Sequence, residues 1–428
     1  MYKAVSIVEV KVWGHQVGAV TLDPSSGYYA FEYAPAWRKR GIELAPLTMP
    51  LAQAAYVFPL LPEATYQRLP ALLADSLPDR FGSALIDAYL AQEGVTSSQI
   101  TALDRLAYMS TRGMGALEFK PARGPRKLKA TAVEVSTLVE GARSALAGRF
   151  DGDAHTKAAI VKLIQVGTSA GGARAKAVIA WNPITKEIRS GQLPADDGFE
   201  SYLLKFDGVG KDAALGTGAN YGRIEYAYHL MARAAGITMS DCALLEEHGR
   251  AHFMTKRYDR VGGEKVHAQT LCAMAHLDFH QIATHDYAQY FNVIKQLKLG
   301  NDALAEAFRR MAFNVLAGNN DDHTKNFSFL LANGGSWQLS PAYDVTHAYN
   351  RENQWTRQHL LSVNGKFSEI SLTDLQIVGN RFMVPGYSDI IRDVTAAVSR
   401  WSEFALQAGV PAAEVLEIGT LIDTLSVL

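Results

Sequence analysis

The stretch that most constrains the fold is residues 319–329, which read Asn-Asn-Asp-Asp-His-Thr-Lys-Asn-Phe-Ser-Phe. The segments on either side of its polar part, Ala312–Leu316 and Phe327–Leu331, are apolar and predict burial. Polar groups held between buried segments need hydrogen-bond partners or a ligand, because an unpaired buried polar group is costly. The alternative is an ordinary polar surface loop with an Asx-turn, which is what Asp/Asn clusters most often form.

The spacing within and after this stretch points to a chemistry. Asp321 and Asn326 are five residues apart, the separation between the base and the magnesium-binding amide in the catalytic loop of a protein kinase. Asp344 follows a strand-like segment, Ser336–Leu339, where such a site needs its principal magnesium carboxylate. These residues therefore favour a phosphoryl-transfer site over a surface loop.

Composition narrows the class of protein. A chain of 428 residues predicts two or three compact units, and 48% hydrophobic with 20% charged residues is typical of a globular protein. The net charge of −1 gives no general attraction to nucleic acid or membrane. Cys242 and Cys272 stand alone, which fits a reducing compartment. With no leader-like or membrane-spanning pattern, we expect a cytoplasmic protein that contacts no membrane.

Hydrophobic periodicity gives the elements of the first part of the chain. The alternation over Ala4–Leu22 predicts two strands joined by a turn, and Phe31–Tyr33 a third strand. Helices are expected over Ala64–Ala74 and Phe81–Gln92. The composition of residues 113–126, rich in glycine, proline and basic residues, predicts a domain boundary.

Residues 167–176 form a loop of mostly small residues that leads into a predicted strand, Ala177–Trp181, and Ile188–Gly191 is expected to pair back on it. Backbone N–H groups in such a loop can converge on an anion, although small-residue loops are more often plain turns. Helices are expected before it, over 132–146 and 154–163.

A lysine within an apolar strand and a helical glutamate follow. A lysine at such a place is either an edge residue whose charged end reaches water, which is commoner for an isolated case, or a buried cation with an anionic partner. Lys205 lies in the apolar predicted strand Ser201–Phe206, and Glu225 is expected in the first turn of the helix 224–235, with Gly236 as its C-cap. A strand lysine followed by a helix glutamate is the arrangement that holds a kinase lysine against nucleotide phosphates. The predicted strand that starts at Ala251 and runs into Lys256-Arg257-Tyr258 would then be the hinge.

The remainder of the chain is dominated by helical patterns, expected over 287–297, 303–316, 390–406 and 414–425. Mixed elements first and helices afterwards predict an α+β, bilobal, protein-kinase-like fold. We expect a small β-rich N-terminal subdomain over 1–112, a mixed α/β N-lobe over 113–258 and a helical C-lobe over 259–428.

These motifs together resemble the HipA family of bacterial serine/threonine kinases, the toxins of toxin–antitoxin pairs. The resemblance extends over nearly the whole chain. The residues that carry it are Leu72–Gly82, Tyr202–Phe206, Lys256–Arg260, Asp321–Ser328 and Leu339–Asp344.

The resemblance implies roles for individual residues. Asp321 would take the proton of the attacking hydroxyl, and Lys325 would neutralise charge on the transferred phosphate. Asn326 and Asp344 would hold Mg²⁺, and Lys205 would contact the phosphates of ATP. Further cofactor-binding residues are expected in the small-residue loop, beside the lysine, at the hinge and around the pocket: Ser169, Ala170, Gly171, Gly172, Glu225, Lys256, Arg257, Tyr258, His323 and Tyr343.

Ser169 matches the serine that family members autophosphorylate, and a phosphate there would add about −2 of charge. The family also implies a small helix-turn-helix antitoxin (HipB-like), contact with DNA only through that partner, and a cellular protein substrate such as an aminoacyl-tRNA synthetase. The chain departs from the family at Arg174-Ala175, where an acidic residue is usual, and at His267–Cys272, which makes a pocket role for Gln269 doubtful.

Three functions remain open from the sequence. An active ATP-dependent kinase is favoured because every polar part of a magnesium–phosphate site is present. A catalytically weak, nucleotide-binding co-repressor that acts through the antitoxin is the second. A magnesium-dependent phosphohydrolase is the third, but it would not require a strand lysine, a helix glutamate and a hinge in this order.

Overall fold

The computed structural model describes residues 2–125, 175–192, 197–208, 220–247 and 249–426, with positions 137–139, 142, 158, 161 and 163–164. The chain forms two compact units. The first consists of residues 1–210, 255–269 and 330–336, and the second of residues 211–254, 270–329 and 337–428. The predicted division into three domains stays a prediction. The expected helices over 132–146 and 154–163 lie largely outside the described residues.

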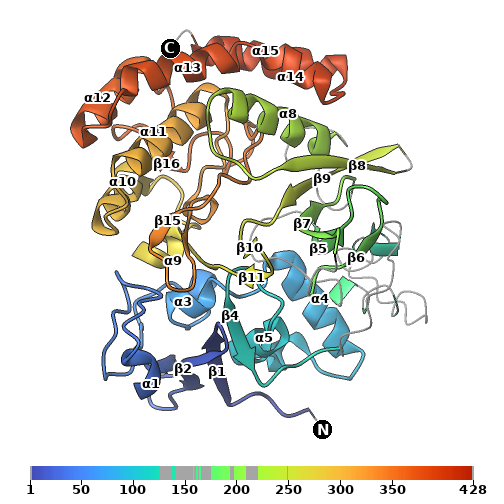
Figure 1. The fold of residues 1–428 in the computed structure, drawn as a ribbon, viewed down its shortest axis with the longest axis vertical. Coiled ribbons are helices and arrows are strands. Elements are labelled where there is room, and N and C mark those ends of the chain that lie inside the picture. Colours follow the sequence, from blue (N-terminus) through green and yellow to red (C-terminus); the bar gives the residue numbers. More distant parts are fainter. Residues whose placement is uncertain are drawn as a thin grey trace. The chain divides into compact units, whose positions relative to one another are not determined.

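The first unit opens with a four-stranded antiparallel sheet in the order β3-β2-β1-β4 (Figure 1). Its strands are β1 Ile7–Val12, β2 His15–Leu22, β3 Tyr29–Tyr33 and β4 Leu117–Lys120. Alternate residues of β1 are buried, as the sequence alternation predicted. A Cβ atom at Gly18 would lie 2.2 Å from the carbonyl oxygen of Glu32, so the close approach of β2 and β3 requires glycine there.

Short helices complete this part of the unit, and two of them are capped by their own sequence. Asp79 accepts a hydrogen bond from the Gly82 N–H at 2.6 Å, and Thr101 forms a capping box with Asp104. The helices are α1 Pro35–Arg38, α2 Glu63–Tyr66, α3 Ala71–Ala74, α4 Arg80–Ala91 and α5 Ala102–Met109. The expected continuous helix 64–74 is wrong, because Gln67 and Arg68 adopt left-handed backbone conformations with φ of 48° and 64°.

A second group of strands belongs to the same unit. Strands β5 Lys176–Trp181, β6 Ile188–Ser190 and β7 Glu200–Lys205 pair antiparallel, with β5 between the other two. This confirms the predicted pairing of Ile188–Gly191 with the strand before it. The hairpin of β10 Arg260–Val261 and β11 Glu264–Lys265 turns at Gly262-Gly263.

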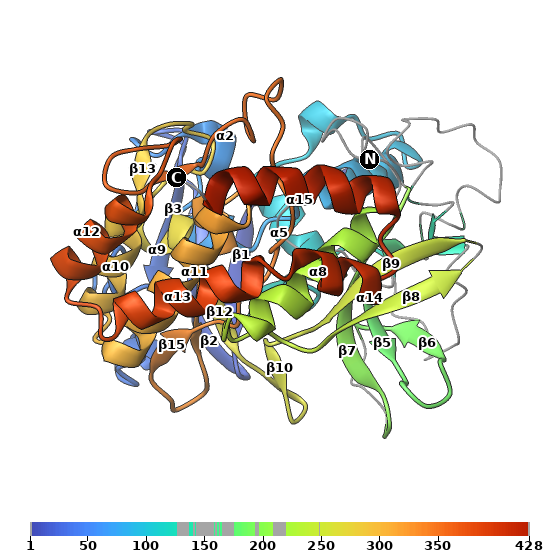
Figure 2. The same ribbon diagram turned by 90° about the horizontal axis from the view of Figure 1, so that it is seen from above.

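The second unit is mainly helical, and Figure 2 shows α13 and α15 running along one face of it. Helix α11 packs against α13 and α15, and α8 packs against α14. The helices are α8 Tyr221–Ala234, α9 Leu271–Ala275, α10 Tyr287–Gln296, α11 Asn301–Leu316, α12 Leu372–Phe382, α13 Tyr387–Val398, α14 Trp401–Gln407 and α15 Ala412–Ser426. The strands not yet named, which are divided between the two units, are β8 Cys242–Glu247, β9 Arg250–Lys256, β12 His267–Thr270, β13 His285–Asp286, β14 Ser328–Leu331, β15 Trp337–Leu339 and β16 Leu361–Ser362.

The structure corrects three helical predictions here. The expected helix 390–406 is two helices, because the chain breaks between Val398 and Trp401. Helix α12 was not predicted. Helix α8 begins at Tyr221, so Glu225 lies just beyond its first turn and not within it.

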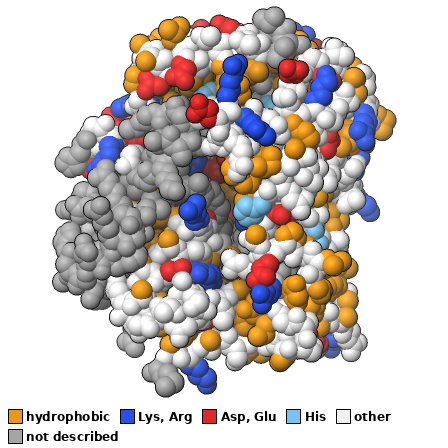
Figure 3. Space-filling view, turned by 180° about the vertical axis from the view of Figure 1, so that it is seen from behind, with side chains coloured by type: hydrophobic (Ala, Val, Ile, Leu, Met, Phe, Trp, Pro, Cys, Tyr) orange, Lys and Arg blue, Asp and Glu red, His pale blue; other side chains and the backbone are white. Residues whose placement is uncertain are grey.

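No helix among the described residues combines the length and apolar character that crossing a bilayer requires. On the face seen in Figure 3, acidic and basic side chains are interspersed with apolar atoms. This mixed pattern agrees with the near-zero net charge of the sequence.

Three histidines, two of them buried and His347 partly buried, make stability depend on pH. Burial lowers the pKa of His229, His267 and His347 to about 4, from 6.5 in the unfolded chain. Between these pH values the unfolded chain binds the protons that the folded chain excludes. Stability should therefore fall as the pH drops from 6.5 to 4, by up to about 1.4 kcal/mol per pH unit for each histidine. Urea denaturation midpoints at pH 7 and pH 5 measure this effect.

The control for this pH dependence is a comparison of two variants. His267→Gln should flatten the profile, whereas His15→Gln, at an exposed position, should leave it unchanged. Equal slopes for both variants and the wild type would show that the buried imidazoles do not cause the loss.

Candidate active site

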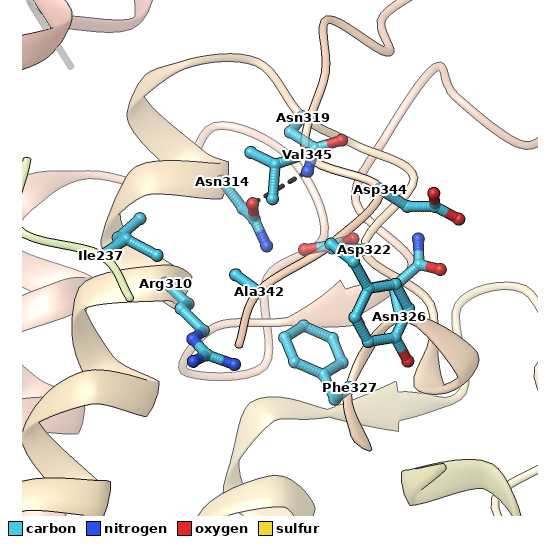
Figure 4. Close-up of a pocket in the computed structure, with 11 residues that line it drawn as sticks. Ile237, Arg310, Asn314, Asn319, Asp322, Asn326, Phe327, Ala342, Asp344 and Val345 are labelled. Carbon is cyan, nitrogen blue, oxygen red and sulfur yellow. Dashed lines mark hydrogen bonds between the residues drawn. The ribbon is translucent and has the colours of Figure 1, made fainter. Parts of the chain in front are cut away.

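A pocket in the second unit gathers residues from α11, from the stretch 319–329 and from the loop after β15 (Figure 4). It contains three of the predicted site residues, Asn326, Tyr343 and Asp344. In Figure 4 the side chains of Asp344 and Asn326 lie on one side of the pocket, with Asp322 between them and α11. The residues that line it are Ile237, Arg310, Asn314, Asn319, Asp322, Asn326, Phe327, Ala342, Tyr343, Asp344 and Val345.

The stretch 321–326 is closed into a compact loop by its own side chains. The Asn326 side-chain amide donates to the carbonyl oxygen of Asp321 at 2.7 Å, so the five-residue spacing is what closes the loop. A short 3-10 helix, Thr324–Asn326, begins where Nδ1 of His323 accepts from the backbone N–H of Lys325 at 3.2 Å. The side chain of Asp321 is 45% exposed, so a second molecule can reach its carboxylate.

Asp322 is the residue that anchors this loop. It is 1% exposed, and its carboxylate accepts from the Tyr287 hydroxyl at 2.8 Å, from Nδ1 of His359 at 2.9 Å and from the backbone N–H of Leu360 at 2.7 Å. Asn314 in turn donates to the Tyr287 hydroxyl at 3.0 Å. A carboxylate with this many donors is a structural acceptor, and it fixes the backbone of its neighbour, the proposed base.

Asp322→Asn should separate this positioning effect from catalysis by Asp321. The amide keeps the shape of the carboxylate but loses its charge and half of its acceptor capacity, so donors among Tyr287 and His359 are left poorly paired. We expect the free energy of unfolding to fall by about 1–3 kcal/mol and the rate of phosphate transfer to fall roughly tenfold. Thermal denaturation and steady-state kinetics measure the two effects.

The control for this prediction is Asp302→Asn at an exposed position of α11, which should change neither quantity appreciably. If Asp322→Asn melts and reacts like the wild type, the buried network does not hold the loop.

Tyr343 connects the loop 321–326 to strand β14, which follows it. Its hydroxyl donates to the carbonyl oxygen of Lys325 at 2.7 Å and lies 2.5 Å from Oγ of Ser328. The next residue, Asp344, has φ of 53°, in the left-handed region that few residues other than glycine adopt. Backbone strain of this kind is common at functional positions, where it aims a side chain.

Phe279 contacts the side chains of two residues of the loop, Lys325 and His323. The Lys325 ammonium lies 4.9 Å from the centre of its ring, and the His323 ring centroid is 5.4 Å from it. Nε2 of His323 is 3.8 Å from the Asp321 carboxylate. A cation over an aromatic face is held in place by the ring quadrupole, so Phe279 orients Lys325. The sequence analysis did not single out Phe279.

The predicted site residues of the first unit are placed as follows. Lys205 is buried at the end of β7, with 8% exposure. The Lys256 ammonium forms an ion pair with Glu200. Arg257 is buried and binds both carboxylate oxygens of Asp259, at 2.9 and 2.7 Å. The Arg257 guanidinium is therefore already paired with a carboxylate of the same unit.

Two more predicted residues belong to the same unit. Tyr258 is half-buried next to Arg257, and Gln269 is buried in β12. Glu225 is 1% exposed on α8 of the second unit. Its pairing with Lys205, which lies in the first unit, stays a prediction. Four predicted residues, Ser169, Ala170, Gly171 and Gly172, lie outside the described residues.

Two family models match the chain. The HipA-like C-terminal domain matches residues 168–402, and the HipA N-terminal domain matches residues 8–120. The chain belongs to the HipA family. The family suggested by the sequence motifs is therefore confirmed.

The fold is also that of HipA. The chain is similar to a solved structure of HipA from Shewanella oneidensis MR-1 in complex with HipB and its operator DNA, with a TM-score of 0.67 and 16% identity, covering 98% of this chain and 96% of that one. The predicted α+β, HipA-like fold is thus confirmed. A protein of Sinorhizobium fredii (strain NBRC 101917 / NGR234) named "Putative kinase Y4dM" is 29% identical over 138 residues, 28% of this chain. The chain matches 32% of the length of that relative.

The donor set of the pocket fits the Mg²⁺ that the family implies. The Asn326 amide nitrogen is used by the Asp321 carbonyl group, which leaves its Oδ1 as an acceptor, and Asp344 contributes a carboxylate. Both are hard oxygen ligands. A site with one or two such side chains is typical of Mg²⁺ that completes its shell with substrate phosphates and water. Within the described residues no cluster of three or more His, Cys, Asp or Glu side chains could hold a metal ion on its own.

Proposed function

We propose that this HipA-family chain is an ATP- and Mg²⁺-dependent protein serine/threonine kinase. The observation that carries the proposal is the arrangement of Asp321, Asn326 and Asp344. The Asn326 amide fixes the backbone of Asp321 at 2.7 Å, while Asn326 and Asp344 line one pocket. This is the separation of base and magnesium ligands that phosphoryl transfer requires.

In the proposed reaction, each residue has one role. Asp321 accepts the proton of the substrate hydroxyl as its oxygen attacks the γ-phosphorus of ATP, and ADP leaves. Asn326 and Asp344 would hold Mg²⁺, which offsets the negative charge of the phosphates. Lys325, held by Phe279, balances charge on the transferred group, and Lys205 binds the phosphates.

The remaining family-implied residues complete the nucleotide site in this proposal. The backbone of Lys256, Arg257 and Tyr258 pairs with the adenine, because the Arg257 guanidinium is already bound by Asp259. His323 and Tyr343 line the pocket, and Glu225 orients Lys205. Ser169 is the proposed autophosphorylation site, in a phosphate-binding loop with Ala170, Gly171 and Gly172.

A helix-turn-helix antitoxin of the HipB type is the proposed partner, with DNA contacted only through it. The support is that the Shewanella relative was solved as a complex with HipB and operator DNA. The protein substrate is a cellular protein carrying a serine or threonine hydroxyl, and an aminoacyl-tRNA synthetase is the first candidate to assay.

The test is incubation of the purified chain with radiolabelled ATP and Mg²⁺, followed by mass spectrometry of the products. We expect phosphate on the chain itself, chiefly at Ser169, and Ser169→Ala should remove that label. Tight ATP binding without transfer to the chain or to any protein in a cell lysate would instead favour the co-repressor. Release of inorganic phosphate without a phosphoprotein would favour the phosphohydrolase.

A further inference from the structure

Two loops of the second unit carry aromatic rings to the surface. Phe279 and His280 lie in the loop after α9, and Trp355 lies in the loop that leads to β16. The ring centroids of Phe279 and His280 are 3.9 Å apart, and those of His280 and Trp355 are 6.2 Å apart. His280 is exposed, and the other two side chains are half-buried. These three rings, called the ring row below, form an aromatic surface that another molecule can contact.

Both loops are held by the stretch that contains the proposed base, Asp321. On one side, the hydroxyl of Thr324 donates to the carbonyl oxygen of Leu277 at 2.7 Å. On the other side, the side-chain amide of Asn320 donates to the carbonyl oxygen of Thr356 at 3.0 Å. Both donors are buried, with 1% and 5% exposure. Loops that bind a partner work best when a rigid scaffold positions them, and here the same short stretch positions the rings and the base.

The ring row also extends toward Asp321. The His323 ring centroid lies 5.4 Å from that of Phe279, and Nε2 of His323 lies 3.8 Å from the Asp321 carboxylate. An extended peptide advances about 3.3 Å per residue, so a side chain within about four positions of a hydroxyl bound at Asp321 can reach His280. Aromatic side chains are enriched where proteins bind other proteins, because they offer a large and rigid contact area.

We propose that the ring row is a docking site for the protein substrate, and that it binds an aromatic or large aliphatic side chain near the phosphorylated serine or threonine. The inference rests on the proposed function, because it takes Asp321 as the base, and it adds the sequence context of the acceptor hydroxyl.

The preference for an apolar side chain follows from the chemistry of the rings. Burial, and to a smaller extent the charge of Lys325, lowers the pKa of His280, so its ring is uncharged near neutral pH. Uncharged rings pack well against apolar groups, whereas a charged side chain would have to give up water to lie on them.

The experiment uses a library of short peptides, each with one serine or threonine and one fixed flanking position. The wild type, Trp355→Ala, His280→Ala and a control are compared with Mg-ATP. The control is Leu416→Ala, which removes an apolar side chain of α15 that is 72% exposed in the same unit. His280→Ala answers the question if Trp355→Ala does not fold.

We expect the wild type and Leu416→Ala to favour an aromatic or large aliphatic residue over alanine at one position near the acceptor, by at least about tenfold in kcat/KM. Trp355→Ala and His280→Ala should reduce this ratio to less than about threefold. The loss should appear in the KM for the peptide and not in kcat, because the docked side chain is bound equally before and during the reaction. Calorimetry should give a Kd for Mg-ATP within about twofold of the wild type in all variants, which a collapse of the site would not allow.

The other results each decide the question. An unchanged preference in the two ring variants would overturn the inference and leave the kinase proposal intact. The same holds if the wild type selects a basic or acidic residue or shows no selection, or if it labels itself and lysate proteins but no peptide. If the wild type transfers phosphate neither to peptides, nor to itself, nor to any lysate protein, the proposed function fails and the inference fails with it.

Discussion

Asp321→Asn should lower the rate of phosphate transfer by at least about 100-fold while leaving the Kd for Mg-ATP within about twofold. Asparagine has nearly the same shape but cannot accept the proton of the attacking hydroxyl. The hydrogen bond from Asn326 goes to the backbone carbonyl oxygen of residue 321 and not to its side chain, so the loop should keep its conformation. Single-turnover kinetics and calorimetric titration with Mg-ATP measure the two quantities.

The matched control is again Asp302→Asn, which removes an exposed carboxylate of the same unit. If Asp321→Asn transfers phosphate at a rate within threefold of the wild type, Asp321 is not the general base. A parallel loss of rate and ATP affinity would make Asp321 a nucleotide or metal ligand instead.

The strands were predictable because their signal is local. Alternation of apolar and polar residues in β1 and β2 follows directly from one buried face. The break in the expected helix 64–74 had a signal that apolar spacing overlooks, because Pro70 lies inside that range and proline interrupts a helix. The left-handed conformations of Gln67 and Arg68 carry no such signal. Helix α12 did have one, since Ser371 and Asp374 form a capping box that precedes an apolar run.

In the candidate site, too, some residues could be found from the sequence and others could not. Asp321 and Asn326 could be found because the hydrogen bond that joins them spans only five residues. The role of Asp322 depends on Tyr287 and His359, which are 35 and 37 residues away. A local sequence pattern does not predict partners at such distances along the chain. The ion pair of Arg257 could have been recognised from the sequence, because its partner Asp259 lies two residues ahead in the same motif.

Asp344 offers a test of the magnesium site in which charge and backbone strain can be separated. Its φ of 53° is tolerated by asparagine and glycine but is strained for alanine. Asp344→Asn should therefore fold like the wild type yet lose the negative ligand for Mg²⁺. We expect a loss of about 3–4 kcal/mol of transition-state stabilisation, which corresponds to roughly 100- to 1,000-fold in kcat/KM.

Asp344→Gly completes the argument because it removes the same carboxylate and also relieves the strained backbone. It should be as inactive as Asp344→Asn but unfold at a slightly higher denaturant concentration, whereas Asp344→Ala should be inactive and less stable. In a titration of Mg²⁺ at fixed ATP, all three variants should need more Mg²⁺ than the wild type to reach half of their residual activity, because each has lost the same carboxylate ligand. If Asp344→Asn and Asp344→Gly keep wild-type magnesium dependence while only Asp344→Ala loses activity, residue 344 shapes the backbone of the pocket and does not hold the metal.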